Sequence, residues 1–226
     1  MSVVKNIKVS NRNVMFILPH PKFIDIHAGL ILGTKHNYVI DTGFGSEHAK
    51  AILEYISDDH KPIIVINTHS HYDHIWGNWC FGKSLIISHR SCRELADKQW
   101  DSIFNEKGEN KVGEVHKCLP NMTFEGSLHF PEDDIEIFHS PGHSIDSISV
   151  YDAVDKVLYA GDSIGDSNDE IVPWIDTDLE TFKNLIKTYR AYDFDTCISG
   201  HNTPQGKDVL CRMETALEDS WKKQNK

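Results

Sequence analysis

Short apolar segments recur along the chain, and most of them come in pairs joined by short turns. Such pairs are typical of β-hairpins, in which successive side chains point to opposite faces of the sheet. The predicted hairpins join residues 23–32 with 38–41, 127–130 with 135–139, and 148–152 with 157–162. Further strands are predicted at residues 62–67, 84–89 and 195–201.

Other segments place apolar residues three or four positions apart, which is the spacing of one face of an α-helix. They are residues 46–56, 91–106, 177–189 and 207–223. Ser46 is the expected N-cap of the first helix, and Ser91 with Glu94 has the spacing of a capping box for the second. Thr177 with Glu180 repeats that spacing at the third helix. The apolar side of the last helix is formed by Val209, Leu210, Met213, Leu217 and Trp221.

Helices intervene between the hairpins, so neither an all-β sandwich nor a simple parallel sheet fits the order of elements. The pattern instead predicts an α/β (α+β) fold, in which two mixed β-sheets pack together and helices cover them outside. No repeat, low-complexity tract or linker rich in proline and glycine divides the sequence. Because 226 residues suit one domain, we expect a single domain over residues 1–226.

The charge and the cysteine usage narrow the class of protein. A formal net charge of −11 disfavours a general nucleic-acid binder, which usually carries a basic surface. No run approaches the roughly 18 apolar residues of a membrane span, and the N-terminus has no signal-peptide pattern. The five cysteines are scattered and odd in number, which favours reduced thiols over a disulfide framework. We therefore expect a cytoplasmic protein with a small-molecule substrate and no nucleic-acid or membrane partner.

Side chains that bind metals gather where predicted strands end. The strand at residues 62–67 is followed within a few positions by three histidines and an aspartate, and single histidines or aspartates follow later strands. The set is His69, His71, Asp73, His74, His143, Asp162 and His201. Zn²⁺, Fe²⁺ and Mn²⁺ accept imidazole and carboxylate ligands, and loops at strand ends are common places for binding groups. The sequence therefore predicts a metal site.

The crowding of these residues in one loop indicates more than one ion. Residues two apart in an extended segment point the same way, so His69, His71 and Asp73 can share a face. A turn would let His74 point toward a second ion. Two neighbouring ions can hold a shared hydroxide, whose pKa falls to about 7 as on a single zinc.

The order of these residues resembles the metallo-β-lactamase superfamily. The matching pattern is His-x-His-x-Asp-His at residues 69–74, followed by a distant histidine, aspartate and histidine in the family's order. It extends from Asp41 to His201, most of the chain, and includes all five usual motif positions of the family. The resemblance implies a four-layer αβ/βα sandwich with its metals at one edge, in agreement with the fold predicted above.

The resemblance also divides the ligands between two divalent metal ions. The first ion would take His69, His71 and His143. The second would take Asp73, His74 and His201, with Asp162 bridging the pair. Asp41 would steady the histidine loop from outside the ligand set. Zinc is the expected metal, with iron or manganese as alternatives.

The implied activity is that of a binuclear metallohydrolase. A hydroxide bridging the metals would attack the carbonyl of a small ester, thioester or lactone. Asp73 and Asp162 would be the catalytic carboxylates, and Asp73 would pass a proton because it lies beside the nucleophile. The alternative is a mononuclear non-haem iron dioxygenase acting on persulfides, which needs two histidines and one aspartate. The presence of all the ligand positions favours two metals.

Differences from the motifs of individual subgroups of the family narrow the range of expected substrates. Glyoxalase II-type thioesterases often read His-x-Gly-Gly-Asn where residues 74–78 read HIWGN. The residues after His201 suffice for one helix, so we expect a short glyoxalase II-like member without the C-terminal helical domain. Ser163 stands where homoserine-lactone hydrolases tend to have tyrosine, and Asp162 where true β-lactamases usually have cysteine.

Aromatic residues near the ligand loops are candidates for substrate contact. Trp76 follows the histidine loop and Trp174 follows an acidic stretch, so both are predicted to line the site, with core packing as the alternative for Trp76. The helix around residues 100–104 is a candidate interface for a homodimer, although core packing explains its apolar residues equally well.

Overall fold

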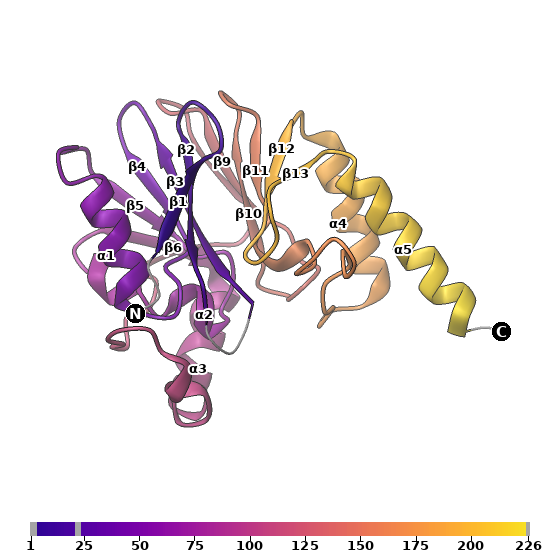
Figure 1. Cartoon of the computed structure of the whole chain (residues 1–226), viewed down its shortest axis with the longest axis horizontal. Coiled ribbons are helices and arrows are strands. Elements are labelled where there is room, and N and C mark those ends of the chain that lie inside the picture. Colours follow the sequence, from indigo (N-terminus) through magenta and orange to yellow (C-terminus); the bar gives the residue numbers. More distant parts are fainter. Residues whose placement is uncertain (1–3, 21–23, 225–226) are drawn as a thin grey trace.

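Two mixed β-sheets lie face to face, and helices cover the outer side of each (Figure 1). The computed structural model describes residues 4–20 and 24–224, with side chains up to residue 219. Its layers are those of the αβ/βα sandwich, so the predicted fold class is confirmed.

The first sheet has seven strands, which follow one another in sequence order. They are β1 (Lys5–Lys8), β2 (Asn13–Leu18), β3 (Ile26–Leu32), β4 (Asn37–Ile40), β5 (Ile63–Ile66), β6 (Leu85–His89) and β7 (Met122–Phe124). Strands β1 to β4 are antiparallel, and β4 to β7 run parallel. Parallel neighbours need crossover connections, which here contain α1 (Ser46–Tyr55), α2 (Tyr72–Ile75) and α3 (Arg90–Lys107).

The second sheet has six strands in the order β13-β12-β11-β10-β9-β8. They are β8 (Ser127–Phe130), β9 (Ile135–His139), β10 (Ile148–Asp152), β11 (Val157–Tyr159), β12 (Thr196–Ile198) and β13 (Gln205–Gly206). Only β11 and β12 are parallel, and α4 (Leu179–Ala191) lies in the connection between them. Helix α5 (Val209–Gln224) packs beside α4 and ends away from the sheets (Figure 1). Short 3-10 turns occur at Asn78–Phe81, Gly108–Asn110 and Gly161–Ser163.

Apolar side chains fill three layers between and outside the sheets. Ile66 and Ile137 are fully buried in the layer where the two sheets meet. Ile52 of α1 packs on the outer face of the first sheet. Phe182 of α4 and Met213 of α5 pack on the outer face of the second. Burial of this apolar surface is the main favourable contribution to folding and fixes the two sheets relative to each other.

All three predicted hairpins form, as β3–β4, β8–β9 and β10–β11. Strand β3 of the first hairpin begins at Ile26, whereas the sequence predicted a start at Phe23, which lies outside the described residues. Strands β1, β2, β7 and β13 were not predicted. Strand β2 is buried along almost its whole length, so it lacks the alternation that marks a half-exposed strand.

The predicted N-caps of the first two long helices are wrong, by one residue for α1 and by two for α3. Ser46 is the first residue of α1, and its Oγ accepts a hydrogen bond from Glu114 N at 2.9 Å instead of capping the helix. Helix α3 starts at Arg90, and the His89 side chain accepts from Ser91 N at 3.2 Å. Histidine is not a common N-cap, so the Ser91 signal was the stronger one in the sequence.

The last two helices also differ slightly from their predicted bounds. Asp178 instead of Thr177 caps α4, because its side chain accepts a hydrogen bond from Thr181 N at 2.9 Å. Both residue types cap helices well, which explains the shift. Helix α5 spans Val209–Gln224, and the side chain of Trp221 lies outside the described residues.

The carboxyl ends of the parallel strands lie at one edge of the sandwich. Strand β4 leads into Asp41 and β5 leads into the loop that carries His69. From the other sheet, β11 leads into Asp162 and β12 leads into His201. This edge is where ligands bind in open α/β sheets.

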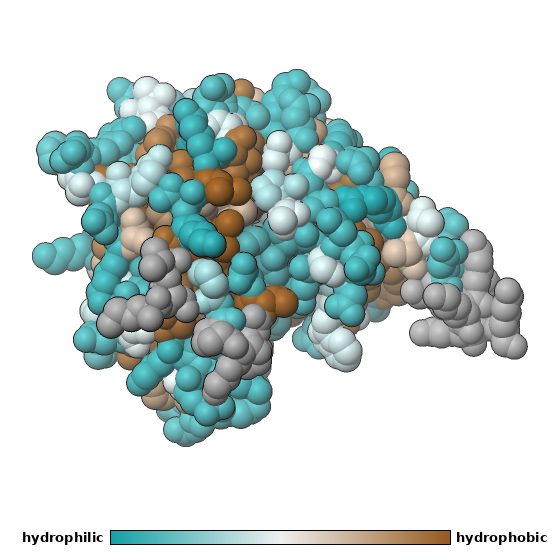
Figure 2. Space-filling view, viewed as in Figure 1, coloured by the Kyte–Doolittle hydropathy of each residue, from teal (hydrophilic) through white to brown (hydrophobic). Residues whose placement is uncertain are grey.

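Residues 4–20 and 24–224 contain no helix with the length and apolar character that would cross a bilayer. Hydrophilic residues cover most of the face shown in Figure 2.

Candidate metal centre

Two sets of metal-ligand side chains come together at this edge, and they share Asp162. Within each set, the candidate ligand atoms all lie within 4.8 Å of one another. The first set is His69, His71, His143 and Asp162. The second set is Asp73, His74, Asp162 and His201. All seven residues that the sequence nominated as ligands are therefore close together, in the two groups that the family resemblance implied.

The local backbone explains how one loop serves both sets. His71 has an extended backbone (φ −64°, ψ 142°) and immediately precedes the short helix α2. Asp73 and His74 lie in that helix. The change from extended chain to helix breaks the alternation of side chains, so His69 and His71 point to the first set while Asp73 and His74 point to the second.

Asp162 lies between the histidines of the two sets. Its Oδ2 is 3.2 Å from His74 Nε2 and 3.3 Å from His201 Nε2, both in the second set. The same oxygen is 3.5 Å from His69 Nε2 and 3.8 Å from His143 Nε2, both in the first set. One carboxylate thus faces two groups of imidazole nitrogens at once.

Asp41 holds the histidine loop from behind. Its Oδ1 accepts a hydrogen bond from Thr68 N at 2.7 Å, and its Oδ2 accepts from His74 Nδ1 at 2.8 Å. The Thr68 hydroxyl donates to Asp41 Oδ2 at 2.7 Å and lies 3.0 Å from His69 Nδ1. Asp41 adopts φ +59°, in the left-handed region that costs free energy for a residue with a Cβ atom. The role expected for Asp41 thus agrees with its contacts.

Backbone carbonyls fix two more histidines. His143 Nδ1 donates to Trp174 O at 2.7 Å, and His201 Nδ1 donates to Asp25 O at 3.0 Å. With Nδ1 engaged in this way, each imidazole presents Nε2 to the centre, as in protein metal sites whose ligands are held from outside. His71 differs because its Nδ1 faces the centre, 3.2 Å from His143 Nε2.

Burial and the carboxylates act on the histidines in opposite directions. Burial works to lower the pKa of His74 and of His201, but the negative charges of Asp162 and Asp73 outweigh it and raise both pKa values well above the ordinary range. The pKa of His69 lies well below that range because burial dominates there. Burial works to raise the pKa of Asp162, but the neighbouring histidines outweigh it and hold that pKa low. The centre attracts positive charge.

The side chains fit divalent metal ions. His69 Nε2 and Asp162 Oδ1 are buried and have no hydrogen-bond partner among the described residues. Buried polar atoms nearly always have a partner, and a metal ion would provide one for both. The backbone also approaches closely, since a Cβ atom at Gly200 would lie 2.2 Å from Asp162 Oδ1 and 2.6 Å from His74 Cε1. The two sets together offer five imidazoles and two carboxylates, and these donors suit zinc, iron or manganese.

Sequence reasoning missed Asp146, which supports the centre. Asp146 is fully buried, and its Oδ2 accepts a hydrogen bond from Ser70 N at 2.8 Å. Ser70 lies between His69 and His71, whereas Asp146 follows His143 in the connection between β9 and β10. Asp146 therefore ties together the two loops that supply the first set. The sequence shows an aspartate near His143, but nothing in it indicates the partner.

The two predicted tryptophan contacts have different outcomes. Trp76 is 1% exposed and packs with Trp100 and Phe104, between α2 and α3. Because α3 covers the ring of Trp76, the predicted contact of this side chain with substrate is excluded. Trp76 and Trp100 both serve in packing. Trp174 is 79% exposed, and its backbone holds His143, so its predicted role in substrate binding stays open.

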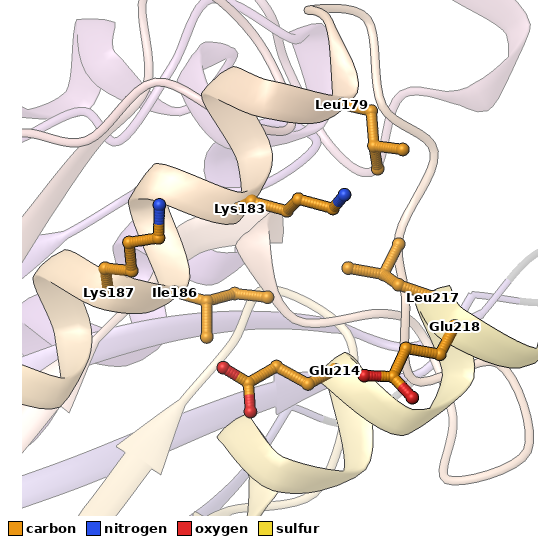
Figure 3. Close-up of a pocket in the computed structure, with 7 residues that line it drawn as sticks. All are labelled: Leu179, Lys183, Ile186, Lys187, Glu214, Leu217 and Glu218. Atoms are coloured by element: carbon orange, nitrogen blue, oxygen red, sulfur yellow. The ribbon is translucent and has the colours of Figure 1, made fainter. Parts of the chain in front are cut away.

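A cavity of about 630 Å³ lies elsewhere, between α4 and α5 (Figure 3). Its lining is Leu179, Lys183, Ile186, Lys187, Glu214, Leu217 and Glu218. None of these residues belongs to the two ligand sets, so the cavity is separate from the metal centre.

Comparisons with known proteins identify the family of this chain. The model of the metallo-beta-lactamase superfamily matches residues 22–201. Acyl-coenzyme A thioesterase MBLAC2 of Homo sapiens is 22% identical over 216 residues, which cover 81% of this chain and 75% of that protein. Hydroxyacylglutathione hydrolase of Pelagibacter ubique is 26% identical over 118 residues, which cover 51% of this chain and 42% of that protein.

A solved structure of TMB-1 has the same fold. It superposes with a TM-score of 0.78 at 17% identity, over 97% of this chain and 99% of the other. At that identity the likeness establishes the fold alone. The match of the family model over residues 22–201, together with the ligand sets at the expected edge, shows that this chain belongs to the metallo-beta-lactamase superfamily.

Proposed function

We propose that this protein is a binuclear metallohydrolase that cleaves an ester, thioester or lactone bond of a small molecule. The observation that supports it most is the position of Asp162 Oδ2, 3.2 Å from His74 Nε2 in one set and 3.5 Å from His69 Nε2 in the other. A carboxylate shared by two sets of ligands suits a pair of ions better than a single ion. Zinc fits the donors, and iron or manganese would use the same ones.

The chain's own residues prepare the centre for this chemistry. Bound ions would lower the pKa of a water molecule to about 7 and polarise the carbonyl oxygen of a substrate. Asp73 Oδ2 lies 3.5 Å from both His74 Nε2 and His201 Nε2, and its side chain is 13% exposed. It would therefore accept a proton and pass it on at the mouth of the centre.

The relatives support carbonyl hydrolysis. By their names, they act on acyl-coenzyme A and on hydroxyacylglutathione, and both compounds are thioesters. The five cysteines, all in the described part of the chain, are unpaired, which supports a reducing compartment such as the cytoplasm.

The test is to replace Asp162 by alanine and to measure turnover of a panel of esters, thioesters and lactones. We expect loss of hydrolysis with little change in the fold, because Asp162 lies at the edge of the sandwich and not in its apolar layers. Asp101→Ala, at an exposed position of α3, is the matched control. Turnover by Asp162→Ala close to that of the control would overturn the proposal. Oxygen consumption with a persulfide would instead favour the mononuclear iron dioxygenase.

A further inference from the structure

The connections that carry the metal ligands contain no lysine or arginine. They are residues 67–78, 140–147, 161–178 and 199–206. Three further connections lie at this edge. Residues 41–45 after β4 also lack lysine and arginine, and Arg90 after β6 pairs with Glu125 at 3.1 Å. The connection between β2 and β3 has Lys22, which lies outside the described residues. An anionic substrate group would therefore meet no cationic side chain from these four connections.

The longest of these connections is instead acidic. Residues 161–178 include Asp166, Asp169, Glu170 and Asp176 in addition to the ligand Asp162, and all four are exposed. Burial raises the pKa of Asp166, and its electrostatic interactions with ligands of both sets show that it lies near the centre. Asp176 N donates a hydrogen bond to His143 O at 2.8 Å, which places this residue beside the first set.

Cationic side chains of other elements that lie near this edge already contact acidic, polar or aromatic side chains. Arg212 contacts the acidic connection at Asn168 Oδ1, at 3.2 Å, but its guanidinium also binds Gln205 Oε1 and Asp208 Oδ2. In the segment after α3, Lys117 Nζ pairs with Asp97 at 2.7 Å, and Lys111 lies over the ring of Phe104. Within residues 4–20 and 24–219, these contacts leave the acidic connection without a balancing charge directed at the centre.

Exposed apolar side chains stand next to the groups that hold the histidines. Trp174 is 79% exposed, and its carbonyl accepts the hydrogen bond from His143. Ile145 is 56% exposed and lies two residues after His143. Ile24 is 44% exposed and precedes Asp25, whose carbonyl accepts from His201. Large exposed apolar residues grouped around a site indicate contact with an apolar ligand group.

We propose that this centre acts on neutral or cationic esters and thioesters that carry an apolar group, and that it discriminates against anionic ones. The inference rests on the proposed hydrolase and specifies its substrate class. The apolar group would lie against Trp174 and Ile145, beside the first set of ligands. Thioesters of coenzyme A and of glutathione carry phosphates or carboxylates, so they would be poor substrates here although the relatives are named for them.

The first test measures binding, which needs no turnover. Three benzyl thiols of similar size are titrated calorimetrically into the protein as purified with its metal: 4-methylbenzyl thiol, 4-(aminomethyl)benzyl thiol and 4-(mercaptomethyl)benzoate. Thiolates bind these metals, so each probe places its para group over the surrounding loops. We expect the benzoate to bind about tenfold more weakly than the other two at low salt, and the gap to shrink as salt is added.

Charge reversal provides a matched pair of variants. Asp169→Lys with Glu170→Lys should strengthen binding of the benzoate probe about tenfold, because it reverses two exposed charges of the acidic connection. Glu54→Lys with Asp58→Lys makes the same change in net charge near the end of α1, at the opposite edge of the first sheet, and should leave the probe's affinity unchanged. Trp174→Ala should weaken the neutral probe without affecting metal content.

The outcomes separate this inference from the proposed function. Equal or tighter binding of the benzoate to the wild type would overturn the inference, and so would equal effects of the two charge-reversal pairs. If the thiols show the expected order but no neutral ester or thioester is hydrolysed, the preference of the site stands and the hydrolase proposal fails. If the purified protein holds no metal and binds no thiol, both fail together.

Discussion

Asp41 Oδ2 accepts a hydrogen bond from His74 Nδ1 at 2.8 Å, although the two residues belong to different crossover connections of the first sheet. The same carboxylate binds Thr68 N and the Thr68 hydroxyl, each at 2.7 Å. Since Thr68 in turn contacts His69, a single buried aspartate orients one histidine of each ligand set. Both ligand sets therefore depend on one residue that belongs to neither of them.

Asp41→Ala should weaken both metal sites. Loss of an outer partner of a ligating histidine usually costs about 10- to 100-fold in metal affinity, and here the effect should reach both ions because His69 and His74 lose their orientation together. Competition with a chromophoric chelator measures both affinities. Retention of wild-type affinity at both sites would show that the loop holds its shape without Asp41.

Asp146→Ala should weaken only the first site. Its carboxylate ties Ser70 N to the connection that carries His143, and in the described part of the chain it makes no hydrogen bond with His74 or His201. We expect the metal affinity of the first site to fall about tenfold while that of the second stays unchanged. The same chelator competition measures both affinities. Asp146→Asn keeps an acceptor for Ser70 N and is the matched control. An equal loss at both sites would contradict the role assigned to Asp146.

Gly200→Ala should disturb the centre by size alone. The added methyl group would lie 2.2 Å from Asp162 Oδ1 and 2.6 Å from His74 Cε1, so Asp162 would have to move from its shared position. We expect reduced metal content and lost turnover. Gly126→Ala adds the same methyl where no heavy atom lies within 4 Å, and it should behave as the wild type. Normal metal content in Gly200→Ala would show that the backbone can yield.

His48 should make the metal-free protein less stable in mild acid. Burial lowers its pKa to about 3 from the ordinary 6.5, and neither ring nitrogen has a hydrogen-bond partner among the described residues. Below pH 6.5 the unfolded chain takes up a proton that the folded chain excludes, so stability falls as the pH drops toward 3. At pH 5 this contribution is roughly 2 kcal/mol.

Replacing His48 by leucine tests that contribution. Urea unfolding in the presence of a chelator should show that the variant loses less stability between pH 7 and pH 5 than the wild type, by about 2 kcal/mol. The chelator removes differences in metal loading, and the other histidines contribute equally to both proteins. Identical pH dependence of the two would mean that His48 gains a proton without unfolding.

The ligands could be predicted from the sequence because their chemistry is local. His69, His71, Asp73 and His74 follow one strand, and their residue types alone indicate a metal. The division into two sets needed the family resemblance, since spacing does not say which later histidine joins which ion. The structure agrees because α2 starts between His71 and Asp73 and turns the two pairs apart.

The supporting contacts could not be predicted, because they join residues far apart in the chain. Asp146 meets Ser70 across 76 positions, and the Asp25 carbonyl meets His201 across 176. Trp76 looked like a site residue because it follows the histidine loop, but α3 packs over it through Trp100. Only the three-dimensional arrangement distinguishes such a buried aromatic from an exposed one such as Trp174.

The central claim is that the two ligand sets hold two ions. It is tested most directly by the metal content per chain, measured by elemental mass spectrometry on protein purified without added metal or chelator. The shared position of Asp162 predicts two zinc, manganese or iron ions per chain, and close to one or none after Asp162→Ala. A single iron per chain in the wild type, unchanged by conditions that load zinc or manganese, would contradict the binuclear centre.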